Sequence, residues 1–123
     1  MRIVVVLALL ICLLPLGARA AEAPAEIDYL LNTIGSSDCT FIRNGKRHNA
    51  QDAEAHLRMK YRRGKRYAPT SEKFIERLAS KSSMSGKLYY IECESDERMA
   101  FGQWLMQRLN EYRASPDDGR RGP

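Results

Sequence analysis

Two stretches, Cys39-Thr40-Phe41-Ile42-Arg43 and Leu88-Tyr89-Tyr90-Ile91-Glu92-Cys93, carry the strongest signal for the fold of this 123-residue chain. Both are rich in β-branched and aromatic residues, which favour β-strands. In the second stretch Tyr89 and Ile91 alternate with their neighbours, as in a strand with one buried face. The first stretch begins with a cysteine and the second ends with one, so a covalent link between the strands is possible.

The two cysteines predict how the strands pair. An antiparallel arrangement that places the cysteines opposite one another determines the other cross-strand partners, giving the pairs Cys39–Cys93, Phe41–Ile91 and Arg43–Tyr89. This register puts both cysteines and both apolar side chains, Phe41 and Ile91, on one face of the sheet, which we expect to be buried. The alternation of side chains and a disulfide therefore require the same pairing.

Helical patterns surround the two strands. Apolar spacing and capping residues predict helices at 25–35, at about 50–63 with Asn49 as the N-cap, from Thr70 or Ser71 onward, and after Ser95. Asn44-Gly45 is a turn signal, and residues 81–87 predict a serine-rich loop. We therefore expect one α+β domain over residues 21–115, with about four helices packed with an antiparallel sheet of two or three strands, and a disordered tail at 116–123.

The N-terminal residues have the pattern of a cleavable signal peptide. Arg2 precedes an uncharged apolar run at residues 3–14, and Ala18 and Ala20 are the small residues that a signal peptidase requires. The alternative is an uncleaved anchor, but the run is well short of the roughly 20 residues that span a bilayer. We expect cleavage of residues 1–20 after Ala20 and release into the periplasm.

Cysteine usage agrees with export. Cleavage removes Cys12 and leaves only Cys39 and Cys93, which we expect to form a disulfide because the periplasm is oxidising. Neither cysteine has a second cysteine or a histidine at the spacing of a metal site.

Basic residues are concentrated in one segment. The chain has 20 Lys and Arg against 15 Asp and Glu, and loss of Arg2 and Arg19 on cleavage leaves 18 against 15, or +3. Residues 43–66 hold nine basic residues and two acids, a local balance of +7. A segment with this balance attracts anions.

Both histidines lie in this basic segment. His48 precedes the helix predicted at 50–63, His56 lies two turns along it, and Asp52 is four residues from each. The two imidazoles and the carboxylate can ligate a metal, or the histidines can bind an anion together with neighbouring cations. They can also be purely structural. The abundance of cations disfavours the metal, and the candidate binding residues are Arg43, Asn44, His48, His56 and Lys60.

A second basic feature follows on the same helix. The segment from residue 58 to residue 66 is expected to form a basic patch of Arg58, Arg62, Arg63, Lys65 and Arg66. Export argues against nucleic acid and favours an anionic lipid, a cell-wall polymer or an acidic protein. The alternative is a solvated helix end, where cations suit the helix dipole. The serines show no nucleophile-elbow pattern, so no catalytic residue is assigned.

Several of these motifs together resemble a known family. Cys39-Thr-Phe-Ile-Arg-Asn-Gly45, His48, Ala53-x-x-His56-Leu57-x-x-Lys60, and the later segment from Phe74-Ile75 to Tyr89 are similar to the YfeK-like family of small bacterial periplasmic proteins. The resemblance extends over residues 24–113 and implies a domain of unknown function, with no catalytic role to transfer.

These observations lead to one expected function and two alternatives. We expect a non-catalytic binding module for an anionic envelope component or an acidic protein partner, with no cofactor, no metal, no nucleic acid and no membrane span. The alternatives are a metal- or histidine-dependent envelope hydrolase, and an inhibitor or accessory factor of another periplasmic protein.

Overall fold

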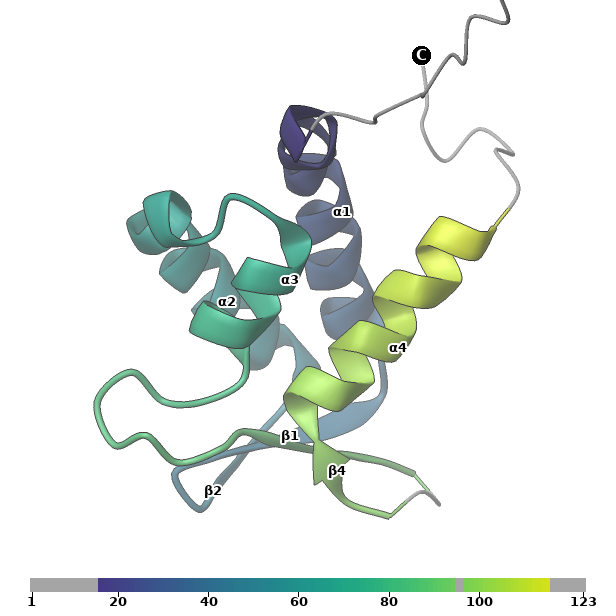
Figure 1. Cartoon of the computed structure of the whole chain (residues 1–123). Helices are drawn as coiled ribbons and strands as arrows, with labels where there is room; N and C mark the ends of the chain where they lie inside the picture. Colours follow the sequence, from purple (N-terminus) through teal and green to yellow (C-terminus); the bar gives the residue numbers. More distant parts are fainter. Residues whose placement is uncertain (1–15, 95–96, 116–123) are drawn as a thin grey trace, which may run out of the picture.

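The fold is an α+β arrangement of helices on a small sheet, as the sequence predicts. The computed structural model describes residues 16–94 and 97–115 (Figure 1). Its elements are α1 (Leu16–Ser36), β1 (Cys39–Arg43), β2 (Lys46–His48), α2 (Ala50–Gly64), the 3-10 turn η1 (Lys65–Tyr67), α3 (Ser71–Phe74), the π-helical turn η2 (Ile75–Ala79), β3 (Tyr90–Cys93), β4 (Met99–Ala100) and α4 (Phe101–Ala114). Residues 1–15 of the expected signal peptide and the expected tail at 116–123 lie outside the described residues.

The antiparallel sheet has the strand order β2-β1-β3-β4. The predicted pairs Cys39–Cys93 and Phe41–Ile91 are confirmed. The β1–β3 ladder ends one step earlier than predicted, at Ile42–Tyr90, so Arg43 is not paired with Tyr89. Arg43 pairs instead with Lys46 of β2. The hairpin turns at Asn44 and Gly45, where φ is positive at both residues, as in the tight turn favoured for this dipeptide.

Two short strands enlarge the sheet beyond the two or three strands expected. β2 contains only Lys, Arg and His, so its sequence has no alternation of apolar and polar residues. β4 is two residues long and pairs with β3 through Tyr90–Ala100 and Ile91–Met99. This pairing precedes α4, which begins at Phe101 rather than near Ser95. Ser95 itself lies outside the described residues.

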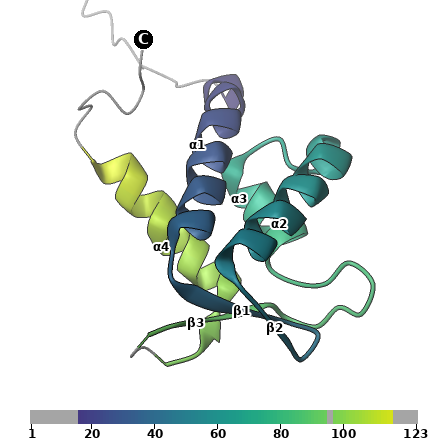
Figure 2. The same cartoon turned by 180° about the vertical axis from the view of Figure 1, so that it is seen from behind.

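The helices cover one face of the sheet, as both views of the molecule show (Figures 1 and 2). Buried apolar side chains fill the space between these layers. They include Ile27, Leu30 and Ile34 of α1, Leu57 of α2, Phe74, Phe41 and Ile91 of the sheet, and Phe101, Trp104, Leu105 and Leu109 of α4. Phe101 meets Phe41 edge to face, with ring centroids 5.1 Å apart, so α4 packs directly on β1.

Local sequence signals locate two helix starts. The Asn49 side chain accepts a hydrogen bond from the Asp52 amide at 2.8 Å and caps α2. The Thr70 hydroxyl accepts one from the Lys73 amide at 3.1 Å and caps α3. α1 is longer than predicted, because it begins at Leu16 and includes both Ala20 and Pro24. Among the helices of the described residues, none has both the length and the apolar character needed to cross a bilayer.

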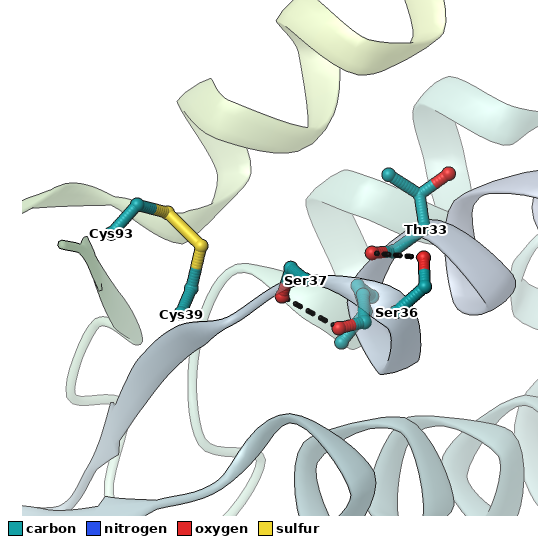
Figure 3. The surroundings of a disulfide bond; sticks show 6 residues. Thr33, Ser36, Ser37, Cys39 and Cys93 are labelled. Carbon is teal, nitrogen blue, oxygen red and sulfur yellow. Dashed lines mark hydrogen bonds between the residues drawn. A yellow bond between two sulfur atoms is a disulfide. The ribbon is translucent and has the colours of Figure 1, made fainter.

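The disulfide joins β1 to β3 close to the end of α1 (Figure 3). It links Cys39 with Cys93 across 54 residues of chain. At the helix end, the Ser37 hydroxyl donates to the Ile34 carbonyl at 2.7 Å, and the Ser36 hydroxyl donates to the Thr33 carbonyl at 3.4 Å. The disulfide therefore attaches the central strands to each other at the point where the chain leaves α1.

Candidate functional site

The five candidate binding residues line one groove. Arg43 and Asn44 come from the β1–β2 hairpin, His48 from the end of β2, and His56 and Lys60 from successive turns of α2. The loop at 82–84 and Tyr89 also line this groove of about 680 Å³. We call it the basic groove. The structure thus brings together residues that are up to 17 positions apart in the sequence, from Arg43 to Lys60.

Four cations and no carboxylate line the basic groove within the described part of the chain. The cations are Arg43, Lys46, Lys60 and Arg63. None of them forms an ion pair with a described Asp or Glu. Other cations are neutralised, because Arg47, Arg58, Arg98, Arg108 and Arg113 each contact a carboxylate. The positive charge of the groove is therefore uncompensated by the surrounding described residues.

Lys60 is held at the groove wall by two hydrogen bonds. Its Nζ donates to the Tyr89 hydroxyl at 3.2 Å and to the Lys81 carbonyl at 3.3 Å. The ammonium also lies 5.1 Å from the centroid of the Tyr89 ring. Burial, and secondarily the nearby Arg43 guanidinium, lower the pKa of Lys60 from its ordinary value. The ammonium therefore lacks part of its hydration and has no counter-ion among the described residues.

The two histidines present unpartnered ring nitrogens. The Nε2 atoms of His48 and His56 are both buried and make no hydrogen bond to the protein residues described. Burial, followed by the charges of Arg43, Lys60 and His48, lowers the pKa of His56 to about 4. His56 is therefore neutral near pH 7, and its ring lies against Tyr89 with the centroids 6.3 Å apart. An unpartnered buried nitrogen is costly, which makes these atoms candidates for ligand contacts.

Asn44 lines the basic groove and also contacts the serine-rich loop at 81–87. Its Oδ1 accepts a hydrogen bond from the Ser85 hydroxyl at 2.6 Å. The loop itself is closed by the Ser82 hydroxyl, which accepts from the Ser85 amide at 3.2 Å. The hairpin turn and the serine-rich loop are thus attached to each other by this hydrogen bond.

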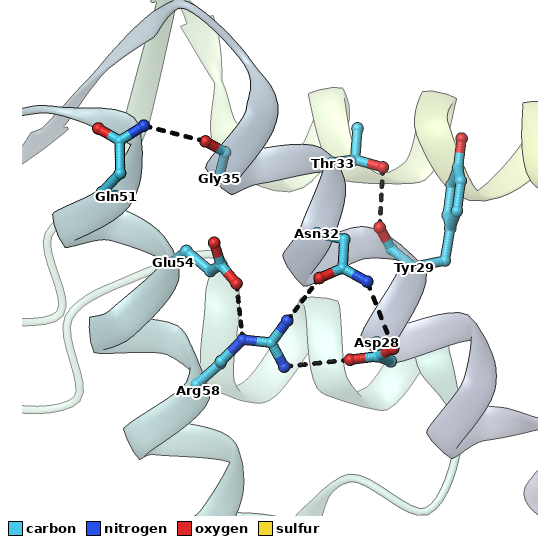
Figure 4. A network of polar contacts seen from close by, with 8 residues as sticks. All are labelled: Asp28, Tyr29, Asn32, Thr33, Gly35, Gln51, Glu54 and Arg58. Carbon is cyan, nitrogen blue, oxygen red and sulfur yellow. Dashed lines mark hydrogen bonds and ion pairs between the residues drawn. The ribbon is translucent and has the colours of Figure 1, made fainter.

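The basic run at 58–66 is distributed over different surroundings. Arg63 lines the basic groove, whereas Arg62 and Lys65 line a separate hollow next to α1. Arg66 lies over the ring of Tyr67, with 4.8 Å between its Cζ and the centroid. Arg58 is part of the contact between α1 and α2 (Figure 4).

Arg58 uses its guanidinium to join these two helices. It donates to Glu54 at 2.7 Å, to Asn32 at 2.8 Å and to Asp28 at 3.1 Å. These neighbours raise its pKa, mainly through the hydrogen bond to Glu54. Figure 4 shows that the guanidinium points toward α1, so this cation has a structural role.

Sequence reasoning did not assign Tyr89 or Lys46 to the site. The strand pattern predicts Tyr89 only as an inward-facing residue, because its contact in the groove depends on Lys60, 29 positions away. Lys46 belongs to the strand that lacks a strand pattern. Asp52 and the two histidines line a smaller cavity next to the groove. Within the described residues, no group of three or more His, Cys, Asp or Glu is arranged to hold a metal ion.

Comparison with known proteins defines the family. Residues 21–113 match the model of a family of unknown function (DUF5329), and the chain belongs to this family. It is similar to the uncharacterized protein YfeK of Salmonella typhimurium (strain LT2), with 39% identity over 90 residues, or 72% of this chain and 75% of that protein. The resemblance to the YfeK-like family is therefore confirmed. No solved structure matches the chain significantly.

Proposed function

We propose that this protein is a non-catalytic binding module of the bacterial periplasm that holds an anionic ligand in the basic groove. One observation carries the proposal: four cations line a groove without a described carboxylate, and none of the four is paired with a described acid. Unpaired charges that converge on a hollow repel one another. An anion in the groove relieves this repulsion and accepts charge-assisted hydrogen bonds.

The shape of the site favours a small anionic ligand over an acidic protein surface. The cations lie on two elements that face a hollow, with Arg43 and Lys46 on the β1–β2 hairpin and Lys60 and Arg63 on α2. His48 and His56 also line this hollow, which a flat protein surface would not fill. We therefore assign the ligand to small anionic components of the envelope.

Three features support export and cleavage after Ala20. The Cys39–Cys93 disulfide suits an oxidising compartment. Pro24 lies inside α1, where its ring opposes the carbonyl of the residue four positions earlier, which is Ala20. Removal of residues 1–20 takes away this carbonyl and leaves Pro24 in the first helical turn, where proline is tolerated. The family match also begins at residue 21.

The test is a titration of the purified protein with inorganic pyrophosphate, followed by NMR or calorimetry. We expect saturable binding, with shifts at residues 43–48 and 56–63. Arg43→Ala and Arg63→Ala should each weaken binding about tenfold, as expected for loss of a charge-assisted hydrogen bond. The double variant His56→Ala/Lys60→Ala should also weaken binding while the circular dichroism spectrum is retained.

Arg62→Ala is the matched control for Arg63→Ala. The two residues are adjacent on α2, but Arg62 lines the separate hollow near α1. Equal losses for both variants would indicate a nonspecific charge effect and overturn the proposal. Absence of pyrophosphate binding, together with a single protein that copurifies in constant ratio through Arg43 and Arg63, would replace the small ligand with a protein partner.

A further inference from the structure

A smaller cavity of about 240 Å³ adjoins the basic groove. Arg43, His48, His56 and Tyr89 line both hollows. The rest of the smaller cavity is mainly apolar, and its buried walls are Phe41, Ile42, Ala53, Leu57 and Phe101. We call it the apolar pocket. The basic groove and the apolar pocket therefore share one wall.

Charge is distributed unequally between the two hollows. The apolar pocket has one carboxylate in its lining, Asp52, whereas no described carboxylate lines the groove. Lys46, Lys60 and Arg63 line the groove but not the pocket. A ligand that occupies both hollows is consequently stabilised when its anionic end lies in the groove and its uncharged end lies in the pocket.

The two histidines form part of the wall between these ends. The buried Nε2 atoms of His48 and His56 are unpartnered within the described chain. Burial keeps the pKa of His56 at about 4, so this ring is a neutral hydrogen-bonding group near pH 7. A neutral ring at the boundary places no charge beside the part of the ligand that links its anionic end to its apolar end.

We infer that the ligand is an amphipathic organic anion, with its charged group in the basic groove and an apolar group about the size of one aromatic ring in the apolar pocket. This inference rests on the proposed function, because the groove must first bind anions. The volume is adequate, since a cavity of about 150 Å³ in another protein takes up benzene. A long lipid chain exceeds the space, so the ligand is a small molecule.

Three probes of matched chemistry test the inference. Methyl phosphate carries the anionic group alone, phenyl phosphate adds an aromatic ring, and phenol carries the ring without the charge. We expect phenyl phosphate to bind at least tenfold more tightly than methyl phosphate, and phenol to bind more weakly than phenyl phosphate. Nuclear Overhauser effects should connect the phenyl protons with the methyl groups of Ile42 and Leu57.

A pair of helix variants separates the pocket from the groove. Ala53 lines the pocket and not the groove, so Ala53→Leu should abolish the advantage of phenyl phosphate and leave methyl phosphate binding unchanged. Ala55→Leu, at an exposed position on the same helix, should change neither. If Ala53→Leu does not fold, the Overhauser contacts to Ile42 and Leu57 decide the question in the unmodified protein.

The outcomes distinguish this inference from the proposed function. Equal affinity for methyl and phenyl phosphate, both dependent on Arg43, would overturn the inference and leave the anion site in place. Absence of binding by either phosphate would contradict the proposed function itself. Phenol binding as tight as that of phenyl phosphate would show that the two hollows act separately. Binding to phosphatidylglycerol vesicles that Ala53→Leu abolishes would assign the pocket to a lipid and overturn the small-molecule assignment.

Discussion

Lys60 of α2 donates a hydrogen bond to the hydroxyl of Tyr89 at 3.2 Å, and its ammonium lies 5.1 Å from the centroid of the same ring. Burial shifts the pKa values of the two groups in opposite directions, lowering that of Lys60 and raising that of Tyr89. The phenol therefore stays neutral and acts as an acceptor for the cation. This contact connects α2 to the segment that leads into β3 and shapes the wall shared by both hollows.

Loss of the Tyr89 hydroxyl should weaken the fold modestly. Tyr89→Phe removes one acceptor of Lys60 and leaves the Lys81 carbonyl, so we expect the free energy of unfolding to fall by about 1 kcal/mol. Urea denaturation measures this change. Tyr90→Phe is the control, because the Tyr90 hydroxyl makes no hydrogen bond to the described residues. Equal losses for the two variants would contradict a role for the Lys60–Tyr89 contact.

Stability should decrease as the pH falls from 6.5 to 4 because of His56. The pKa of His56 is about 4 in the folded chain and 6.5 without the fold, so the unfolded state binds more protons in this interval. The contribution of His56 to the free energy of unfolding is complete above pH 6.5 and is lost as the pH falls through 4. Urea denaturation across this range should show a shallower dependence in His56→Gln. An NMR titration that gives His56 a pKa near 6.5 in the folded protein would contradict the prediction.

The disulfide should supply a large part of the stability. Cys39 and Cys93 close a loop across 54 residues, and its loss in Cys39→Ala/Cys93→Ala should reduce the free energy of unfolding by about 4 kcal/mol. Urea denaturation with and without a reductant measures this difference. The reductant should have no effect on the double variant. A loss below about 1 kcal/mol would show that the sheet and helix packing suffice without the covalent link.

Arg113 of α4 should be essential for the packing of the helices. Its guanidinium donates to the buried carboxylate of Glu26 at 2.7 and 2.9 Å and to Glu72 at 2.6 Å. Arg113→Ala removes both hydrogen bonds between the guanidinium and Glu26. We therefore expect the free energy of unfolding to fall by about 3 kcal/mol. Lys73→Ala, which breaks an exposed ion pair with Glu76, should cost less than about 0.5 kcal/mol. Thermal or urea denaturation of the two variants provides the comparison.

Local sequence determined the central strand pair and two helix starts. Cys39, Phe41 and their partners follow from side-chain alternation, because a shift of one residue would turn every apolar side chain to the other face. Asn49 and Thr70 cap helices through contacts with residues three positions away. Each of these features depends on neighbours in the chain or on one covalent pairing, so the sequence pattern contains enough information to predict it.

Tertiary structure alone decided the remaining strands and the availability of each cation. The sequences of β2 and β4 show no alternation of apolar and polar residues that would predict a strand. These two segments are strands because they pair with β1 and β3. Arg58 and Arg63 are five residues apart on one helix, yet Arg58 meets carboxylates and Arg63 lines the basic groove. Their spacing rotates them to different sides of the helix. Only the packing of α1 on one side and of the hairpin on the other gives the two arginines different roles.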